Sequence, residues 1–369
     1  MLTDKKSKIS SKFAHKFVTM VSANLRQTIE EKIKTEIKAE IKAEIKADIK
    51  VELERLWFEL GNLPQNIARF CRTIEEKKAS GEFEARVCAL DLRTLIRTAA
   101  GLDASNPHST DSHDLFTEFR FLRALADTLR PAFQAITDRR ILFCGQAYYN
   151  VWYLSRALRD LGLKADVYNW DTNKSNRLYY HGEDYCLGVN VPLSLKGELG
   201  FYLDSLYSYD VIHFSNANGI TYGFGLQHAV KEKYGDHEEI YLLRKLGKVV
   251  VYSNNGCQDG VSQTSFSKWG TENVCSICRW QSEPDVCSDE RNLAWGAFRN
   301  SVADFQCTLG GNRVDYNDDV RVHEVPEFYC LEPNLWHPDI EIPERYKLPL
   351  MPAGGVRVYH AVGNLEART

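Results

Sequence analysis

From Arg139 onward, short apolar runs alternate with amphipathic segments, and this alternation restricts the chain to few folds. Helical segments at 149–161 and 236–246 each end at a glycine, Gly162 and Gly247, as helices commonly do. Buried strands that alternate with helices predict an α/β protein with a Rossmann-like, doubly wound parallel sheet. The apolar runs expected to form strands are 141–144, 165–168, 210–214 and 248–252.

The segments that precede this alternation have a different character, so the sequence predicts several regions. A break rich in Ser, Asn and Pro at 105–109 interrupts the earlier helical segments, and Asp111 or Ser112 is placed to cap the next helix. Leu115, Phe119, Leu122 and Leu125 then fit one apolar helix face. The predicted regions are a low-complexity helical extension at 1–55, a helical region at 56–137, a Rossmann-like domain at 138–335 with a cysteine-rich insertion near 257–290, and a linker with one further strand at 336–369.

The extension at 1–55 supports three interpretations. Apolar residues recur at every fourth position from Phe13 to Leu53, and this period drifts around a helix without forming a straight coiled-coil seam. A solvated spacer is the favoured interpretation. The first alternative is a rod that joins copies of the chain. The second is a basic tail at 1–22 that makes weak contact with an anionic membrane surface.

Composition and charge exclude several classes of function. The formal net charge of −4 leaves no global basic footprint for nucleic acid. No window approaches the 18 apolar residues of a membrane-spanning helix, and the N-terminus lacks the apolar core of a secretory signal. We therefore expect a cytoplasmic protein, either free or peripheral at the inner face of a membrane. Its ten cysteines are then expected to be thiols or metal ligands rather than disulfides.

Polar loops follow three of the predicted strands, at 145–150, 215–219 and 253–259. In doubly wound sheets the ligand crevice lies beyond the carboxyl ends of the strands. Amide side chains and glycine-exposed backbone suit a neutral, polyhydroxylated ligand such as a sugar, whereas turn chemistry alone is the alternative. The absence of G-x-G-x-x-G and Walker A sequences disfavours a dinucleotide or P-loop site. The candidate ligand-binding residues are Gly145, Gln146, Tyr148, Asn150, Asn216, Asn218 and Gly219.

Two titratable residues near these loops are candidates for catalysis. Asp259 places a carboxylate close to a glycine after a predicted strand, and an Asx-turn is its alternative role. His213 lies inside a predicted strand and faces either the crevice or the core. A hydrogen-bonded structural histidine is the favoured interpretation of His213.

The cysteine cluster is the sharpest local signal. Cys275 and Cys278 form a C-x2-C knuckle, Cys287 follows it, and Cys257 precedes it. Four thiolates around zinc would make a closed tetrahedral site that stabilises a long insertion. The spacing differs from a standard zinc ribbon, so cysteines that only pack in the core, or a redox pair, are the alternatives.

The order of motifs from Arg139 to Thr369 resembles the family 4-like glycosyltransferases of the two-Rossmann, GT-B class. The sequence Gly-Cys-Gln-Asp at 256–259 looks like the family's loop at this place, although a glutamine separates the cysteine from the acid. Ala-Asp-Phe at 303–305 resembles the strand that opens with Ala-Asp. The stretch 325–338 resembles the exit into the second domain, with Glu332 where aspartate is usual.

The last residues resemble the beginning of the family's donor domain. The segment 356–364 looks like its first strand and loop, and the resemblance assigns His360, Asn364 and Arg368 to the donor side. In such enzymes the N-terminal half holds a glycan or other acceptor and the C-terminal half holds a nucleotide sugar. The resemblance thus implies an acceptor-side domain that is followed by only the start of a donor domain and is inactive alone. A non-catalytic, zinc-stabilised interaction module and a sugar-nucleotide epimerase are the alternatives.

Overall fold

The computed structural model describes most of the region from residue 61 to residue 308. The chain divides into two compact units, Met1–Pro64 and Gln65–Thr369, and the elements of the sheet belong to the second. The predictions for 1–55 and 336–369 lie outside the described residues. The described ranges are 61–106, 111–145, 150–171, 183–215, 220–254, 263–267, 270–284, 287–308 and 322–324.

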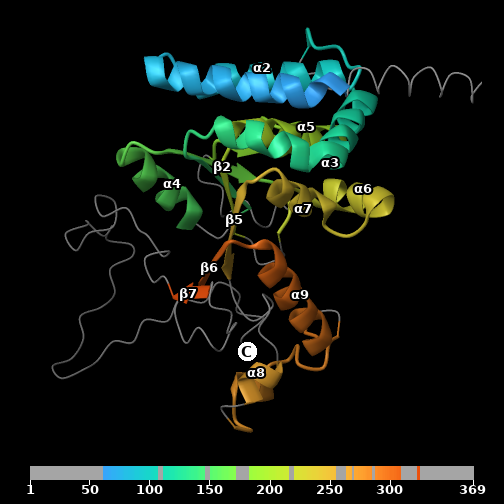
Figure 1. Ribbon diagram of the computed structural model, residues 1–369. Coiled ribbons are helices and arrows are strands. Elements are labelled where there is room, and N and C mark those ends of the chain that lie inside the picture. Colours follow the sequence, from blue (N-terminus) through green and yellow to red (C-terminus); the bar gives the residue numbers. More distant parts are fainter. Residues whose placement is uncertain are drawn as a thin grey trace, which may run out of the picture. The chain divides into compact units, whose positions relative to one another are not determined.

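A parallel sheet forms the centre of this unit (Figure 1). Within the described residues it has seven strands in the order β3-β2-β1-β4-β5-β6-β7, and every neighbouring pair is parallel. The predicted α/β, Rossmann-like fold is therefore confirmed, and the strand order reverses between β1 and β4. The strands are β1 (Arg140–Cys144), β2 (Lys164–Asn169), β3 (Tyr185–Cys186), β4 (Val211–Phe214), β5 (Val249–Asn254), β6 (Phe305–Thr308) and β7 (Val322–Glu324).

Helices connect the strands, as the sequence pattern predicts. Residues 61–80 are also helical. No described helix has both the length and the apolar character that a membrane span requires. The helices are α2 (Ala85–Ala99), α3 (Ser112–Ala135), α4 (Asn150–Asp160), α5 (Leu195–Ser208), α6 (Phe224–Tyr234), α7 (Glu238–Lys245), α8 (Gln263–Ser267), the 3₁₀ helix η2 (Val274–Ile277) and α9 (Asp289–Val302).

The two faces of the sheet are covered by different helices. α4 packs on the face that carries Phe143 and Val167, where Val151 completes a buried cluster. The opposite face carries Tyr168 and Tyr252, whose rings contact α5 and α9 respectively. α2 and α3 lie on α5, and α3 also contacts α7, so they form a further layer on that side (Figure 1). Burial on both faces explains why these strands read as continuous apolar runs.

Glycines end two of the predicted helices. Gly162 has φ 81° and Gly247 has φ 82°, a backbone conformation that favours glycine. After α4 the N–H of Leu163 donates to the carbonyl of Leu158, and after α7 the N–H of Lys248 donates to that of Leu243. These are the bonds of a Schellman cap, so the stop signals predicted at both glycines are confirmed.

A buried ionic cluster joins α2 and α3 to α5. Arg97 and Glu118 are both fully buried and lie 2.8 Å apart, and Arg93 contacts Glu118 at 3.0 Å. Arg93 also pairs with Asp204 of α5, and the Tyr207 hydroxyl donates to Glu118 at 3.0 Å. Burial alone would lower the pKa of Arg93, but the two carboxylates raise it above its usual value. The cluster therefore holds the helical region predicted at 56–137 against the sheet domain by charge as well as by apolar contact.

Candidate ligand site at the carboxyl ends of the strands

The carboxyl ends of β1 and β4 meet at the point where the strand order reverses. The Gly145 N–H donates to the Tyr168 carbonyl at 2.9 Å, and the Ser215 N–H donates to the Cys144 carbonyl at 3.0 Å. Gly145 has φ 101°, which favours glycine at this turn, and α4 begins at Asn150 after a short loop. β1 and β4 are neighbours, so the predicted loops at 145–150 and 215–219 begin side by side. In doubly wound sheets ligands bind beyond this edge.

His213 lies on β4 just beneath this edge and is buried. Its Nε2 atom is 2.5 Å from the Ser253 hydroxyl of β5, and its ring lies 5.0 Å from that of Phe143. Burial lowers the pKa of His213 to about 3, so the imidazole is neutral at physiological pH. A neutral, hydrogen-bonded ring of this kind supports the structural interpretation of His213 and offers little as a general base.

The Ser253 hydroxyl also bonds the thiol of Cys307 on β6. Burial raises the pKa of Cys307 to about 11, although the bond from Ser253 opposes this rise. The thiol is therefore protonated and unreactive at neutral pH, because the thiolate is the nucleophile. The side chains beneath the site are thus neutral and hydrogen-bonded to one another, and they do not make a catalytic triad. They belong to His213, Ser253 and Cys307.

Ser215 is the buried polar group at this edge that lacks a protein partner. Its side chain is fully buried, yet its Oγ has no hydrogen-bond partner in the described structure. Strand alternation places it on the same face as His213. Leaving a buried hydroxyl unsatisfied costs about 1–3 kcal/mol, and a bound group that donates or accepts a hydrogen bond there removes this cost.

Trp170, directly after β2, adds a second unsatisfied donor at the same edge. It is 4% exposed, its Nε1–H has no hydrogen-bond partner among the described residues, and its ring meets that of Phe224 at 5.0 Å in an edge-on contact. Phe224 begins α6 and is 47% exposed. Trp170 was not among the predicted site residues. Its position just after a predicted strand is the feature of the sequence that could have identified it.

The N-terminus of α6 at this edge is already occupied by an anion from the chain itself. Glu198 of α5 is buried, and its Oε2 accepts from the Leu226 N–H at 2.6 Å. Burial raises the pKa of Glu198, while backbone bonds from Leu226 and Gly225 lower it. Because helix N-termini are where phosphates bind, this internal carboxylate removes α6 as a phosphate site.

Gly223 is expected to be essential for this internal cap. Its φ is 149°, and an added Cβ would lie 2.5 Å from Glu198 Oε2. We expect Gly223→Ala to lower the free energy of unfolding by about 2 kcal/mol, through backbone strain and displacement of the carboxylate. Urea unfolding measures this change. Gly200→Ala in α5 is the control, since nothing lies within 4 Å of its Cβ position and alanine favours helix; an equal loss in both variants would contradict the role of Gly223.

Several predicted site residues cannot be placed. Gln146, Tyr148, Asn216, Asn218, Gly219 and Asp259, together with the donor-side residues His360, Asn364 and Arg368, lie outside the described residues. Asn150 begins α4, and Gly145 and His213 are placed as described above. The described residues thus bring together the beginnings of two predicted loops and the strand interior beneath them.

The predicted zinc ligands fall in the insertion between β5 and β6. Cys275 and Cys278 lie at the 3₁₀ helix η2, where the Cys278 N–H donates to the Cys275 carbonyl at 3.1 Å. The thiol of Cys287 accepts from the Gln263 side chain at 3.3 Å. These three sulfurs do not form a group within 4.8 Å of one another in the described part of the chain, and Cys257 lies outside it. The four-cysteine zinc site stays a prediction.

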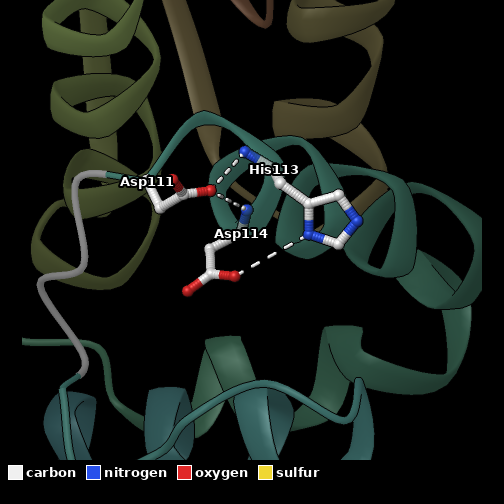
Figure 2. A group of neighbouring side chains, drawn as sticks. All are labelled: Asp111, His113 and Asp114. Atoms are coloured by element: carbon white, nitrogen blue, oxygen red, sulfur yellow. Dashed lines mark hydrogen bonds and ion pairs between the residues drawn. The ribbon is translucent and has the colours of Figure 1, made fainter.

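Among the described residues, one group brings three possible metal ligands close together (Figure 2). Its members are Asp111, His113 and Asp114. Figure 2 shows the Asp111 carboxylate accepting from the backbone N–H groups of His113 and Asp114. Asp114 also pairs with the buried Arg97 at 3.2 Å. Asp111, one of the two residues predicted to cap this helix, is therefore the N-cap of α3, and helix capping accounts for the cluster.

Comparison of the chain with protein-family models, curated proteins and solved structures found no match.

Proposed function

We propose that the edge where β1 and β4 meet binds the sugar of a glycosyl acceptor, and that the chain contains the acceptor-side domain of a glycosyltransferase. The observation that carries the proposal is the buried, unpartnered hydroxyl of Ser215 at the reversal of strand order. The unpartnered indole N–H of Trp170 lies at the same edge of the sheet. A nucleotide sugar is the proposed donor and is assigned to the C-terminal residues, in line with the resemblance of the motifs.

The chemistry of this edge favours a neutral ligand over an anionic one. His213 is neutral, the thiol of Cys307 is protonated, and the N-terminus of α6 is filled by Glu198. Sugar hydroxyls both donate and accept hydrogen bonds, so one of them can satisfy the Ser215 hydroxyl. A dinucleotide, which the epimerase alternative requires, needs instead a helix N-terminus preceded by a glycine-rich turn.

The proposal is tested by ligand binding to the full chain and to Ser215→Ala. Saturation-transfer NMR with the methyl glycosides of glucose, galactose, mannose and N-acetylglucosamine should detect at least one that binds. Loss of one hydrogen bond of about 1 kcal/mol should weaken that glycoside about five-fold in Ser215→Ala. The same variant should be as stable as the parent or more stable by about 1 kcal/mol, because an unsatisfied buried hydroxyl is removed.

Ser205→Ala provides the matched control. Ser205 is equally buried, but its hydroxyl donates to the Tyr202 carbonyl at 2.7 Å and lies 2.9 Å from the Tyr222 hydroxyl. Its loss should cost about 1 kcal/mol of stability and leave glycoside binding unchanged. Absence of binding by all four glycosides would contradict the proposal, and binding of NAD⁺ in their place would favour the epimerase alternative.

A further inference from the structure

A cavity lies at the opposite, amino-terminal edge of the sheet. It has a volume of about 450 Å³, and all its lining residues belong to the described structure. Its walls include Phe133 at the end of α3, Ile141 of β1, Val211 of β4 and Leu163. Volumes of about 300–1,000 Å³ with mostly apolar walls are typical of sites for small molecules.

Lys248 places an amine in this apolar setting. It stands between Gly247 and β5, it lines the cavity, and only 6% of the residue is exposed. Its Nζ lies 5.2 Å from the centre of the Phe133 ring. Lys248 forms no salt bridge with any residue in the described ranges, and the other charged residues that line the cavity are Asp210 and Arg139.

Asp210 is the nearby acid, but its carboxylate is engaged elsewhere. One oxygen accepts from the backbone N–H groups of Asp138 and Arg140, at 2.9 and 3.2 Å. Its charge acts on Lys248 only from a distance, and this favours the ammonium form weakly. Burial dominates and lowers the pKa of Lys248 to about 8. At pH 7 the neutral fraction of such an amine is about 300 times that of an amine with the usual pKa of 10.5.

We propose that Lys248 is a nucleophilic amine that condenses with small aldehydes entering this cavity. The nitrogen lone pair attacks the carbonyl carbon, a carbinolamine forms, and loss of one water leaves an imine between Nζ and the former carbonyl carbon. No oxidant or reductant takes part in the condensation. Desolvated lysines in apolar pockets form such adducts because the neutral amine is the reacting form. The site is separate from the proposed acceptor site, which lies at the other ends of the same strands.

The test compares two amines within the same folded molecule. The full chain is incubated with propanal and sodium cyanoborohydride at pH 7, and the N-propyl lysines are quantified by mass spectrometry of peptides. The hydride donor is the reagent that traps the imine as a stable secondary amine. Lys248 should be modified on the order of 10-fold faster than Lys245, an exposed lysine in the last turn of α7.

Three further measurements separate the reactivity of Lys248 from its exposure to solvent. The rate at Lys248 should level off above pH 8, whereas the rate at Lys245 should keep rising toward higher pH. In 8 M urea the preference for Lys248 should disappear, because the cavity is lost. Lys248→Met should abolish the fast phase and Lys245→Met should leave it intact. A folded protein in which Lys248 reacts no faster than Lys245 would overturn the proposal, whether or not the variants fold.

Discussion

Replacing Glu118 by glutamine is expected to lower the free energy of unfolding by about 3 kcal/mol or more. Glu118 is fully buried and is bonded by Arg93, by Arg97 and by the Tyr207 hydroxyl. The substitution leaves two buried guanidinium groups without their shared carboxylate, and breaking a buried ion pair from one side typically costs about 3–5 kcal/mol. Urea unfolding at neutral pH, followed by circular dichroism, measures the loss.

The control for this prediction lies on the same helix. Asp127 of α3 is exposed, and Asp127→Asn should change stability by less than about 0.5 kcal/mol. A combined Arg97→Met and Glu118→Leu variant should recover part of the loss, because removal of both partners leaves fewer uncompensated charges. If Glu118→Gln were as mild as Asp127→Asn, the cluster would not be what fastens α2 and α3 to α5.

The second large effect is expected at Glu239, in the form of a pH-dependent stability. Glu239 is fully buried in the first turn of α7, and no other residue of the described structure donates a hydrogen bond to its carboxylate. Burial, with the negative charges of Glu238 and Asp236, raises its pKa to about 7 from the usual 4.5. Between these values the folded chain holds a proton that the unfolded chain has released, so stability falls as the pH rises.

The expected size follows from the width of this interval. The change from 4.5 to about 7 corresponds to about 3 kcal/mol, present below pH 4.5 and lost by about pH 7. Glu239→Gln keeps the shape without the charge, so relative to the parent it should gain about 3 kcal/mol between pH 4.5 and pH 8. Unfolding in urea at a series of pH values measures the difference at each pH. Glu232→Gln, on an exposed part of α6, should show no such gain; a pH-independent difference for Glu239→Gln would contradict the prediction.

The sequence predicted strands and helix ends correctly where the residues of a single segment determine its conformation. Strands β1, β2, β4 and β5 fall on the predicted apolar runs within a few residues, because strands buried on both faces are apolar throughout. Gly162, Gly247 and Asp111 mark helix ends as predicted, since caps depend only on neighbouring backbone groups. The apolar face of α3 is buried at Leu115, Phe119 and Leu122, whereas Leu125 is half-buried at a kink in the helix.

Elements that depend on distant partners were not predicted. β3 has only two residues, Tyr185 and Cys186, and their strand conformation comes from pairing with β2. Such a segment buries too little apolar surface to leave a pattern in the sequence. Helix α5 was likewise not predicted, although the Ser194 hydroxyl caps it by accepting from the Gly197 N–H at 3.1 Å.

The sequence by itself determined the class of fold, the ends of several helices and the edge of the sheet where polar loops gather. Tertiary structure decided the chemistry of individual side chains. His213 is neutral because the surrounding core excludes water and so lowers its pKa. Lys248 is desolvated in a cavity that includes Phe133, from a helix more than one hundred residues earlier. A hydrogen bond or a pKa depends on which groups surround an atom, and groups that are far apart in the chain become neighbours only when it folds.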